Sequence, residues 1–308
     1  MEFIAREADA ITRRAFELGG RNAYFSSRAE FVAALRLVAQ GLDRDGRTQA
    51  YSQALANALT ALSEADDFVP GAAQLEANLN LKSIVACHGT PVLKTADLSN
   101  LTAMAASQFY LTFAQEQFGA ASGGEVAASM ALRGLGKLHE TMADKKVQGI
   151  VAARPKAVTF FQSALLACPA NHMASNDLGV MLARNGRLED ARTALEHSLL
   201  VSQQASTWHN LAVVYGQLGD PRSAERARRQ AQSLTQATPG GRQGKSSETP
   251  VVQWVDPQTF AQRTTETPGA PAFAPPVRPA TNSTGATATT PDRQISRWQP
   301  GKPTDKRK

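Results

Sequence analysis

Two stretches that lie 33 residues apart decide the fold of this chain: NDLGVMLARNG at residues 176–186 and HNLAVVYGQLG at residues 209–219. In each stretch a leucine precedes a small residue. A large side chain follows three positions later, and a glycine four positions after that. Ala191 and Ala224 extend the agreement at the same offset. A fixed period of this size is typical of a solenoid of stacked helix pairs.

The residue types in the two stretches suit a helical hairpin. Gly179 and Ala212 are small enough to let two helices approach closely. Gly186 and Gly219 stand where a first helix must stop, and glycine adopts the left-handed cap geometry without steric cost. Apolar residues at helical spacing then predict the second helices: Ala191, Leu195, Leu199, Ala224, Ala227, Ala231 and Leu234. Two unrelated amphipathic hairpins that agree by chance are a weaker interpretation of so many matches.

These residues resemble the tetratricopeptide repeat, whose period is 34 residues. The resemblance implies an all-α fold, a right-handed α-solenoid of antiparallel helical hairpins, and a binding module for a protein or peptide of unknown identity. A divergent first unit matches the pattern at Ile11, Ala15, Leu18, Asn22, Ser27, Phe31 and Ala34. A further unit matches at Leu135, Gly136, Ala157, Phe161 and Ala164, with residues 140–154 predicted to be an insertion.

The chain divides into three predicted segments. Residues 1–94 are expected to form N-terminal helical hairpins that include the divergent unit. Residues 95–238 are expected to form a helical domain with its clearest repeats at 172–234. Residues 239–308 hold 11 of the 16 prolines and no apolar periodicity, which predicts a disordered, Pro/Thr-rich basic tail.

Local signals predict several further details of the fold. Ser27 with Glu30 three residues later is typical of a capping box at a helix start. Asp43 to Gly46 reads as a polar turn, because the position needed to complete a calcium loop is Ala54. Apolar series predict helices over residues 47–66, 74–86, 97–118 and 125–143, with a break over 119–124. Residues 87–94 are the least helical stretch, either a linker or a segment with a specific role.

The net charge of +6 belongs mainly to the predicted tail, which carries 10 basic and 5 acidic residues. Residues 1–238 carry 23 basic and 22 acidic residues, so no specific nucleic-acid partner is expected for the folded part. The tail also contains a motif at residues 251–262, with Trp254, Val255 and Phe260 as aromatic and apolar anchors. A short linker would let this motif dock on its own solenoid, and the alternative is that Trp254 engages a second protein.

No catalytic, cofactor or metal site is predicted, so we expect a protein that is not an enzyme. The five histidines show no ligand pair on one helix, and the two cysteines show no ligand spacing. Gly134 and Gly136 lie inside a predicted helix, which does not fit a dinucleotide-binding turn. No apolar run approaches the ~20 residues of a transmembrane segment, and the charged N-terminus is not a secretory signal. A cytoplasmic location is therefore expected.

The resemblance implies that binding takes place on the concave face formed by the first helix of each hairpin. The residues expected on that face are Met173, Asn176, Val180, Ala183, Arg184, Ser206, His209, Asn210, Val213, Gly216 and Gln217. Asn176, Arg184 and Asn210 are similar to residues with which family members clamp a peptide carboxylate. Because Val180 and Val213 are apolar, we expect a neutral or mildly apolar peptide. The alternative is a nucleic-acid or envelope-surface attachment factor that acts through the basic tail.

Overall fold

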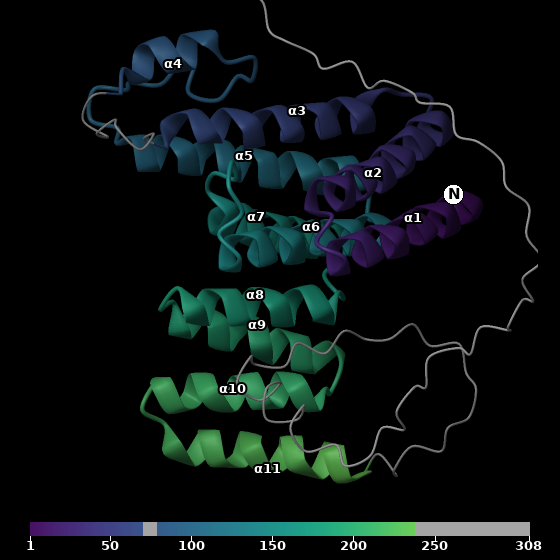
Figure 1. Ribbon diagram of the computed structural model, residues 1–308, viewed down its shortest axis with the longest axis vertical. Helices are drawn as coiled ribbons and strands as arrows, with labels where there is room; N and C mark the ends of the chain where they lie inside the picture. The colour runs from purple at the N-terminus through teal and green to yellow at the C-terminus, as the bar shows by residue number, and fades with distance from the viewer. Residues whose placement is uncertain (70–78, 238–308) are drawn as a thin grey trace, which may run out of the picture. The chain divides into compact units, whose positions relative to one another are not determined.

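The computed structural model describes residues 1–69 and 79–237 (Figure 1). These residues contain eleven α-helices, one short 3-10 helix and no strand. The helices are α1 (Glu2–Gly20), α2 (Tyr24–Gly46), α3 (Ala50–Glu64), η1 (Ala65–Phe68), α4 (Leu81–Cys87), α5 (Ala103–Ser122), α6 (Val126–Asp144), α7 (Ala153–Ala167), α8 (His172–Arg184), α9 (Leu188–Val201), α10 (Ala205–Gln217) and α11 (Pro221–Ala237). The predicted all-α helical-repeat solenoid is confirmed over these residues. The predicted tail, 239–308, lies outside them.

Four helical hairpins follow the repeat pattern: α1–α2, α6–α7, α8–α9 and α10–α11. We call the first helix of each hairpin helix A and the second helix B. Helix B of one hairpin contacts helix A of the next, as α7 does with α8 and α9 with α10 (Figure 1). Each hairpin therefore covers an apolar surface that its neighbour would otherwise expose.

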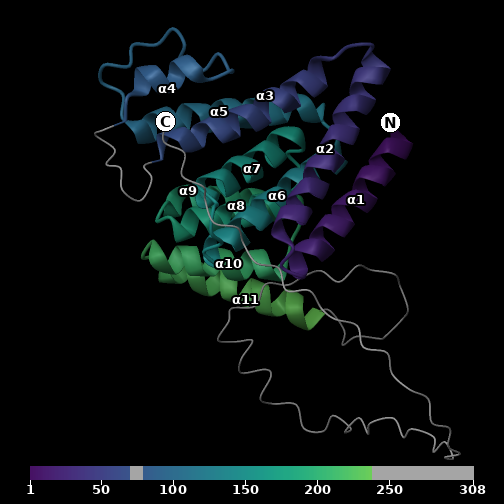
Figure 2. The ribbon, with the colours of Figure 1, turned by 45° about the horizontal axis from the view of Figure 1, so that its top comes forward.

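The first hairpin packs on a helix that is distant in the sequence. Both α1 and α2 contact α6, although residues 47–125 separate α2 from α6 (Figures 1 and 2). A Cβ atom at Gly134 of α6 would lie only 2.2 Å from the Phe31 ring of α2. Phe31 is the repeat counterpart of Phe161 and Leu195. The divergent unit therefore continues the stack directly into α6. Helices α3 and α5 pack on each other and form an inserted layer, in which α5 contacts α7.

Close crossings within the hairpins depend on glycine. A Cβ atom at Gly136 would meet the Phe161 ring at 2.5 Å, and one at Gly179 would meet Leu195 Cγ at 2.6 Å. Both large side chains are fully buried on helix B. The predicted close approach at Gly179 is therefore confirmed, and Gly136 repeats it one unit earlier.

All four helices A end in the same cap. Asn22, Lys146, Gly186 and Gly219 have φ between 49° and 79°. In the hairpins with glycine, the Arg187 amide donates to the Leu182 carbonyl at 3.0 Å and the Asp220 amide to the Tyr215 carbonyl at 2.9 Å. Ala23 and Val147 make the matching bonds to Leu18 and Met142. This pattern is the Schellman motif, which satisfies carbonyls at the helix end.

The predicted capping box at Ser27 is wrong. Helix α2 begins at Tyr24, three residues earlier, because the cap at Asn22 leads directly into it. Ser27 is fully buried inside α2, where its hydroxyl donates to the Ala15 carbonyl at 2.7 Å. Glu30 instead pairs with Arg14 of α1 at 2.6 Å. Both side chains join α1 to α2 rather than start a helix.

The predicted bounds of α5 also need correction. The helix begins at Ala103 rather than at residue 97, because the Thr102 hydroxyl accepts the Ala105 amide at 3.1 Å and caps it. It continues through Gly119 to Ser122 and ends at Gly123, whose φ is +53°. A Cβ atom at Gly119 would lie 3.1 Å from Leu166 Cβ. Gly119 therefore serves the contact between α5 and α7 rather than the break.

The segment from Asp43 to Gly46 is the last turn of α2 rather than a polar turn between helices. The Asp43 carboxylate accepts the backbone amides of Tyr51 at 3.0 Å and Ser52 at 2.9 Å. These two amides belong to the first turn of α3, whose N-terminal donors need such partners. Asp43 therefore caps α3 from the preceding helix.

The segment after α4 is anchored at the end of α3. The buried Glu64 carboxylate accepts the backbone amides of Gly89 and Thr90 and the Thr90 hydroxyl. His88 packs edge-on against Phe68 and Tyr110, and its Nε2 lies 3.1 Å from Asp67 Oδ2. These contacts give the segment a structural role in holding α4 against η1.

Buried apolar residues form two clusters. One extends from Ala8 to Ala174 and the other from Ala157 to Val214. The domain boundary suggested after residue 94 stays a prediction, and residues on both sides of it contribute to the first cluster.

Replacing Gly179 by leucine is expected to lower the free energy of unfolding by about 1–3 kcal/mol, because overpacking forces side chains out of their preferred geometry. Urea denaturation measures the change. Gly216→Leu is the matched control, since no atom lies within 4 Å of a Cβ built there. The control should be neutral or slightly stabilising, because glycine in a helix costs about 0.5–1 kcal/mol relative to alanine. Equal losses from both variants would contradict the close crossing at Gly179.

A second prediction concerns His139 of α6, which is buried against Phe160 with a ring separation of 5.2 Å. Burial, followed by the charges of Lys156 and Arg28, lowers its pKa to about 3. An unfolded histidine has a pKa of about 6.5, so between these values only the unfolded chain binds the proton. Stability should therefore fall as the pH falls through this window.

His139→Leu should weaken this acid sensitivity, because leucine binds no proton. Leucine is chosen because Leu182 occupies the equivalent repeat position. Free energies of unfolding in urea near neutral pH and near pH 4.5 provide the comparison. His209→Leu, at an exposed position, is the control. A pH dependence unchanged by His139→Leu would show that this histidine is not the source.

Candidate functional site

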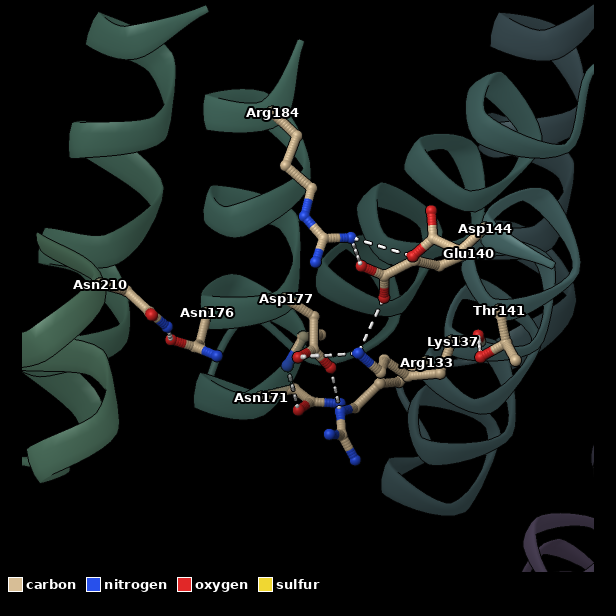
Figure 3. A network of polar contacts seen from close by, with 11 residues as sticks. Arg133, Lys137, Glu140, Thr141, Asp144, Asn171, Asn176, Asp177, Arg184 and Asn210 are labelled. Carbon is tan, nitrogen blue, oxygen red and sulfur yellow. Dashed lines mark hydrogen bonds and ion pairs between the residues drawn. The ribbon is translucent and has the colours of Figure 1, made fainter. Parts of the chain in front are cut away.

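Helices A of the last three hairpins present a common row of side chains, which we call the A-helix face. It comprises Arg133, Lys137, Glu140 and Asp144 of α6, Met173, Asn176, Asp177, Val180 and Arg184 of α8, and His209, Asn210, Val213 and Gln217 of α10. Residues three or four apart on a helix lie on one side of it, which sets these rows. Figure 3 shows that the charged members of α6 and α8 point toward one another, whereas Asn176 of α8 points toward Asn210 of α10.

Charged residues of the face pair between α6 and α8. Arg184 Nη1 donates to Glu140 Oε1 at 2.8 Å and lies 3.3 Å from Asp144 Oδ2. Lys137 Nζ lies 2.7 Å from Glu140 Oε2. The Glu140 side chain is only 8% exposed, so its charge is held by two cations rather than by water.

A second pair lies one turn away (Figure 3). Arg133 Nε donates to Asp177 Oδ2 at 2.7 Å, and Lys137 Nζ lies 3.9 Å from Asp177 Oδ1. Three cations therefore meet three carboxylates where α6 and α8 face each other. The charges of this part of the face neutralise one another.

Polar contacts also connect α8 to its neighbours on both sides. Asn210 Nδ2 of α10 donates to Asn176 Oδ1 of α8 at 2.9 Å. Asn171 caps α8 by accepting the Ala174 amide, and its Nδ2 donates to Ser129 Oγ of α6 at 2.8 Å. These bonds fix the three helices A in register.

Apolar side chains remain accessible between the paired polar groups. Val213 is 48% exposed, and Val180 and Met173 are partly exposed. The face therefore offers uncharged contact area on α8 and α10, beside charges that are already paired on α6 and α8.

Residues 173–206 match the family model of the tetratricopeptide repeat. The chain carries a tetratricopeptide repeat. The match covers α8, α9 and the first residues of α10, so the resemblance seen in the sequence is confirmed there. Tetratricopeptide repeats are protein-interaction modules, and the repeat indicates a protein–protein interaction scaffold with a protein partner. The fold of such repeats is generally non-catalytic.

One similar solved structure is the crystal structure of BtubC (BKLC) from P. vanneervenii, with 16% sequence identity and a TM-score of 0.33. The alignment covers 82% of this chain and 99% of that chain. A likeness at this level supports no inference about function. The search of curated proteins gives no match.

Some of the predicted groove residues form contacts between helices, and others are exposed to solvent. Arg184, Asn176 and Asn210 are engaged in the contacts between helices. His209 and Gln217 are exposed. Whether these residues bind a partner stays a prediction. The tail motif at Trp254, Val255 and Phe260 lies outside the described residues.

The charged part of the face on α6 was not predicted. Leu135 and Gly136 align with Leu178 and Gly179, and this alignment places Lys137 level with Val180 and Glu140 level with Ala183. The insertion after α6 hides this register in the sequence. The same alignment is the signal that could have revealed Glu140 as a neighbour of α8.

Two hollows of the described residues lie away from the A-helix face. A cavity of about 210 Å³ lies between α4 and the segment that follows it, lined by Lys82, Val85, Ala86, Leu93, Lys94, Ala96 and Leu98. An open hollow borders α11. Neither involves the A-helix face.

Within residues 1–69 and 79–237 no cluster of three or more potential metal ligands is found. Over the same ranges, every helix is too short or too polar to cross a membrane.

Glu140→Ala is expected to lower the free energy of unfolding by about 1–3 kcal/mol, because it leaves Arg184 and Lys137 without their buried carboxylate. Asp144→Ala is the matched control. Asp144 also contacts Arg184, but its side chain is 36% exposed, so the expected loss is below about 1 kcal/mol. Chemical denaturation of both variants tests the difference. A larger loss from Asp144→Ala would contradict the role given to Glu140.

Proposed function

We propose that the chain is a non-catalytic protein-interaction scaffold that binds a peptide segment on the A-helix face. The tetratricopeptide repeat at residues 173–206 supports a protein partner. The residues proposed to contact the peptide are Met173, Asn176, Val180, Arg184, His209, Asn210, Val213 and Gln217. They lie on α8 and α10, the helices A of the two clearest repeats.

The pairing of charges on this face supports a neutral or mildly apolar peptide. Arg184 already contacts Glu140 and Asp144. A peptide carboxylate would compete with these partners for the charge of Arg184, which would leave the buried Glu140 with less compensation. Val180 and Val213 offer contact area without such a cost. The exposed Val213 beside an internally paired charge network is the observation that carries the proposal.

The alternative, attachment to nucleic acid or an envelope surface, would depend on residues 239–308. Those residues lie outside the described ranges, and the matched repeat favours the scaffold. Docking of the Trp254 motif on its own solenoid, a cytoplasmic location and the boundary after residue 94 also stay predictions. The two functions differ in their response to salt, because phosphate contacts weaken steeply as salt rises.

A peptide selected from a displayed random library against the full chain provides a probe. Val180→Arg combined with Val213→Arg should reduce its affinity at least about tenfold, since the variant places unpaired cations in the apolar contact area. Leu200→Arg is the matched control, because Leu200 is 85% exposed but lies on α9, a helix B. Fluorescence anisotropy with the labelled peptide measures both.

The affinity for the full chain should change by less than about threefold between low and high salt, because a neutral peptide has few charges to screen. If Leu200→Arg is the damaging change, the peptide binds the outer face and the proposed site is wrong. If binding instead falls steeply with salt, charges rather than the apolar contact area hold the peptide, and the proposal of a neutral peptide is wrong.

A further inference from the structure

The near neutrality of the folded part hides an uneven distribution of charge. Residues 1–220 carry 19 basic and 21 acidic residues. Helix α11 carries four arginines and one glutamate: Arg222, Glu225, Arg226, Arg228 and Arg229. All of the positive excess of residues 1–238 therefore lies on one helix.

The arginines of α11 are exposed. Over residues 221–236 the helix fully buries only Ala224 and Ala227. The side chains of Arg228 and Arg229 are 54% and 72% exposed, and Arg222 and Arg226 also lie at exposed positions. Arg222, Arg226 and Arg229 follow at spacings of four and three, so they form one stripe along the helix.

Helix stability does not account for this stripe. The N-terminus of a helix favours acidic residues, because its unpaired amides carry partial positive charge. Helix α9 follows this preference with Glu189 and Asp190 in its first turn. In α11 the acidic group stands at the cap, where the Asp220 carboxylate accepts the Ser223 amide at 3.0 Å, and Arg222 lies in the first turn. Asp220 therefore satisfies the start of the helix, and the arginines that follow add no stability to it.

Local pairing neutralises only part of the charge. Glu225 lies 3.6 Å from Arg228 Nη1 and 3.1 Å from Arg229 Nε, so one carboxylate serves two cations. Arg226 donates to Ser223 Oγ. Among the described residues, no carboxylate lies within ion-pair distance of Arg222 or Arg226. A terminal unit of a solenoid needs a polar outer face, but that need does not favour one sign of charge.

We propose that the outer face of α11 binds the phosphate backbone of nucleic acid without sequence specificity. Guanidinium groups match phosphate oxygens in a two-pronged geometry. The stripe from Arg222 to Arg229 spans roughly 10 Å of helix, enough to follow about three phosphates of one strand. This activity goes beyond the proposed peptide binding and does not rest on it.

The composition of the face favours nucleic acid over an acidic protein. Protein interfaces place large apolar or aromatic side chains at their centre. Apart from Pro221, the exposed residues of α11 are arginine, glutamate, glutamine, serine and threonine. Side chains of these polar types, together with arginine, supply most contacts to phosphate and sugar. A surface of charge and hydrogen-bond donors therefore suits a polyanionic backbone.

The test uses the full chain and a labelled oligothymidylate about 20 nucleotides long, with binding measured by fluorescence anisotropy at several salt concentrations. Arg222→Ala, Arg226→Ala and Arg229→Ala are combined in one variant. Each lost phosphate contact lowers the slope of log affinity against log salt by about 0.7 for a single strand, so the slope should fall by about 2. At low salt the affinity should fall at least about tenfold.

A matched variant combines Arg6→Ala, Arg13→Ala and Arg187→Ala, which removes the same charge from exposed positions elsewhere. It should leave the slope unchanged, and circular dichroism should show both variants folded. Absence of binding by the full chain, or equal losses in both variants, would overturn the proposal. Tighter binding of polyglutamate than of the oligonucleotide, lost on changing α11, would assign the face to an acidic protein instead.

Discussion

The structure depends on close contact between helices at glycine. Gly136 faces Phe161, and Gly179 faces Leu195, at distances that no side chain larger than hydrogen could share. A large apolar residue on helix B thus fills the space that glycine leaves on helix A. Because both large side chains are fully buried, each hairpin gains apolar burial in proportion to how closely its helices approach. Gly134 and Phe31 make the same kind of contact between hairpins. That contact joins the first hairpin to α6, although the inserted layer separates them in the sequence.

This constraint has an electrostatic consequence on the A-helix face. Once helices A are fixed in register, residues at matching positions in successive hairpins become neighbours. Glu140 of α6 then meets Arg184 of α8, and Arg133 meets Asp177. Such pairs would contribute little if they were fully exposed, but Glu140 and Asp177 are mostly buried. In the proposed binding site, a charged ligand would therefore compete with ion pairs that already exist.

The parts of the fold that follow one period could be predicted from the sequence. Gly179, Gly186 and Gly219 mark crossings and caps because each has a strict steric reason for its place. Asn22 also matches the repeat pattern, and asparagine is found in such caps, whereas the residue type of Lys146 does not indicate the same geometry. The contact of the first hairpin with α6 was also not predicted, since local patterns carry no information on which distant helices pack. The charge network was not predicted for the same reason, because Glu140 and Arg184 become partners only through the packing of α6 against α8.

The two surfaces differ in how their charges are balanced, and the difference follows from their place in the stack. The charged part of the A-helix face lies where α6 and α8 meet, and an unpaired buried charge there would lose water and gain no partner. Its cations are therefore matched by carboxylates on the neighbouring helix. Helix α11 is helix B of the last described hairpin, and its arginines are exposed to water, so an excess of one sign costs little there. Burial explains why the inner charges are paired. It does not explain why the outer face keeps four arginines against one glutamate, and that asymmetry points to an anionic partner.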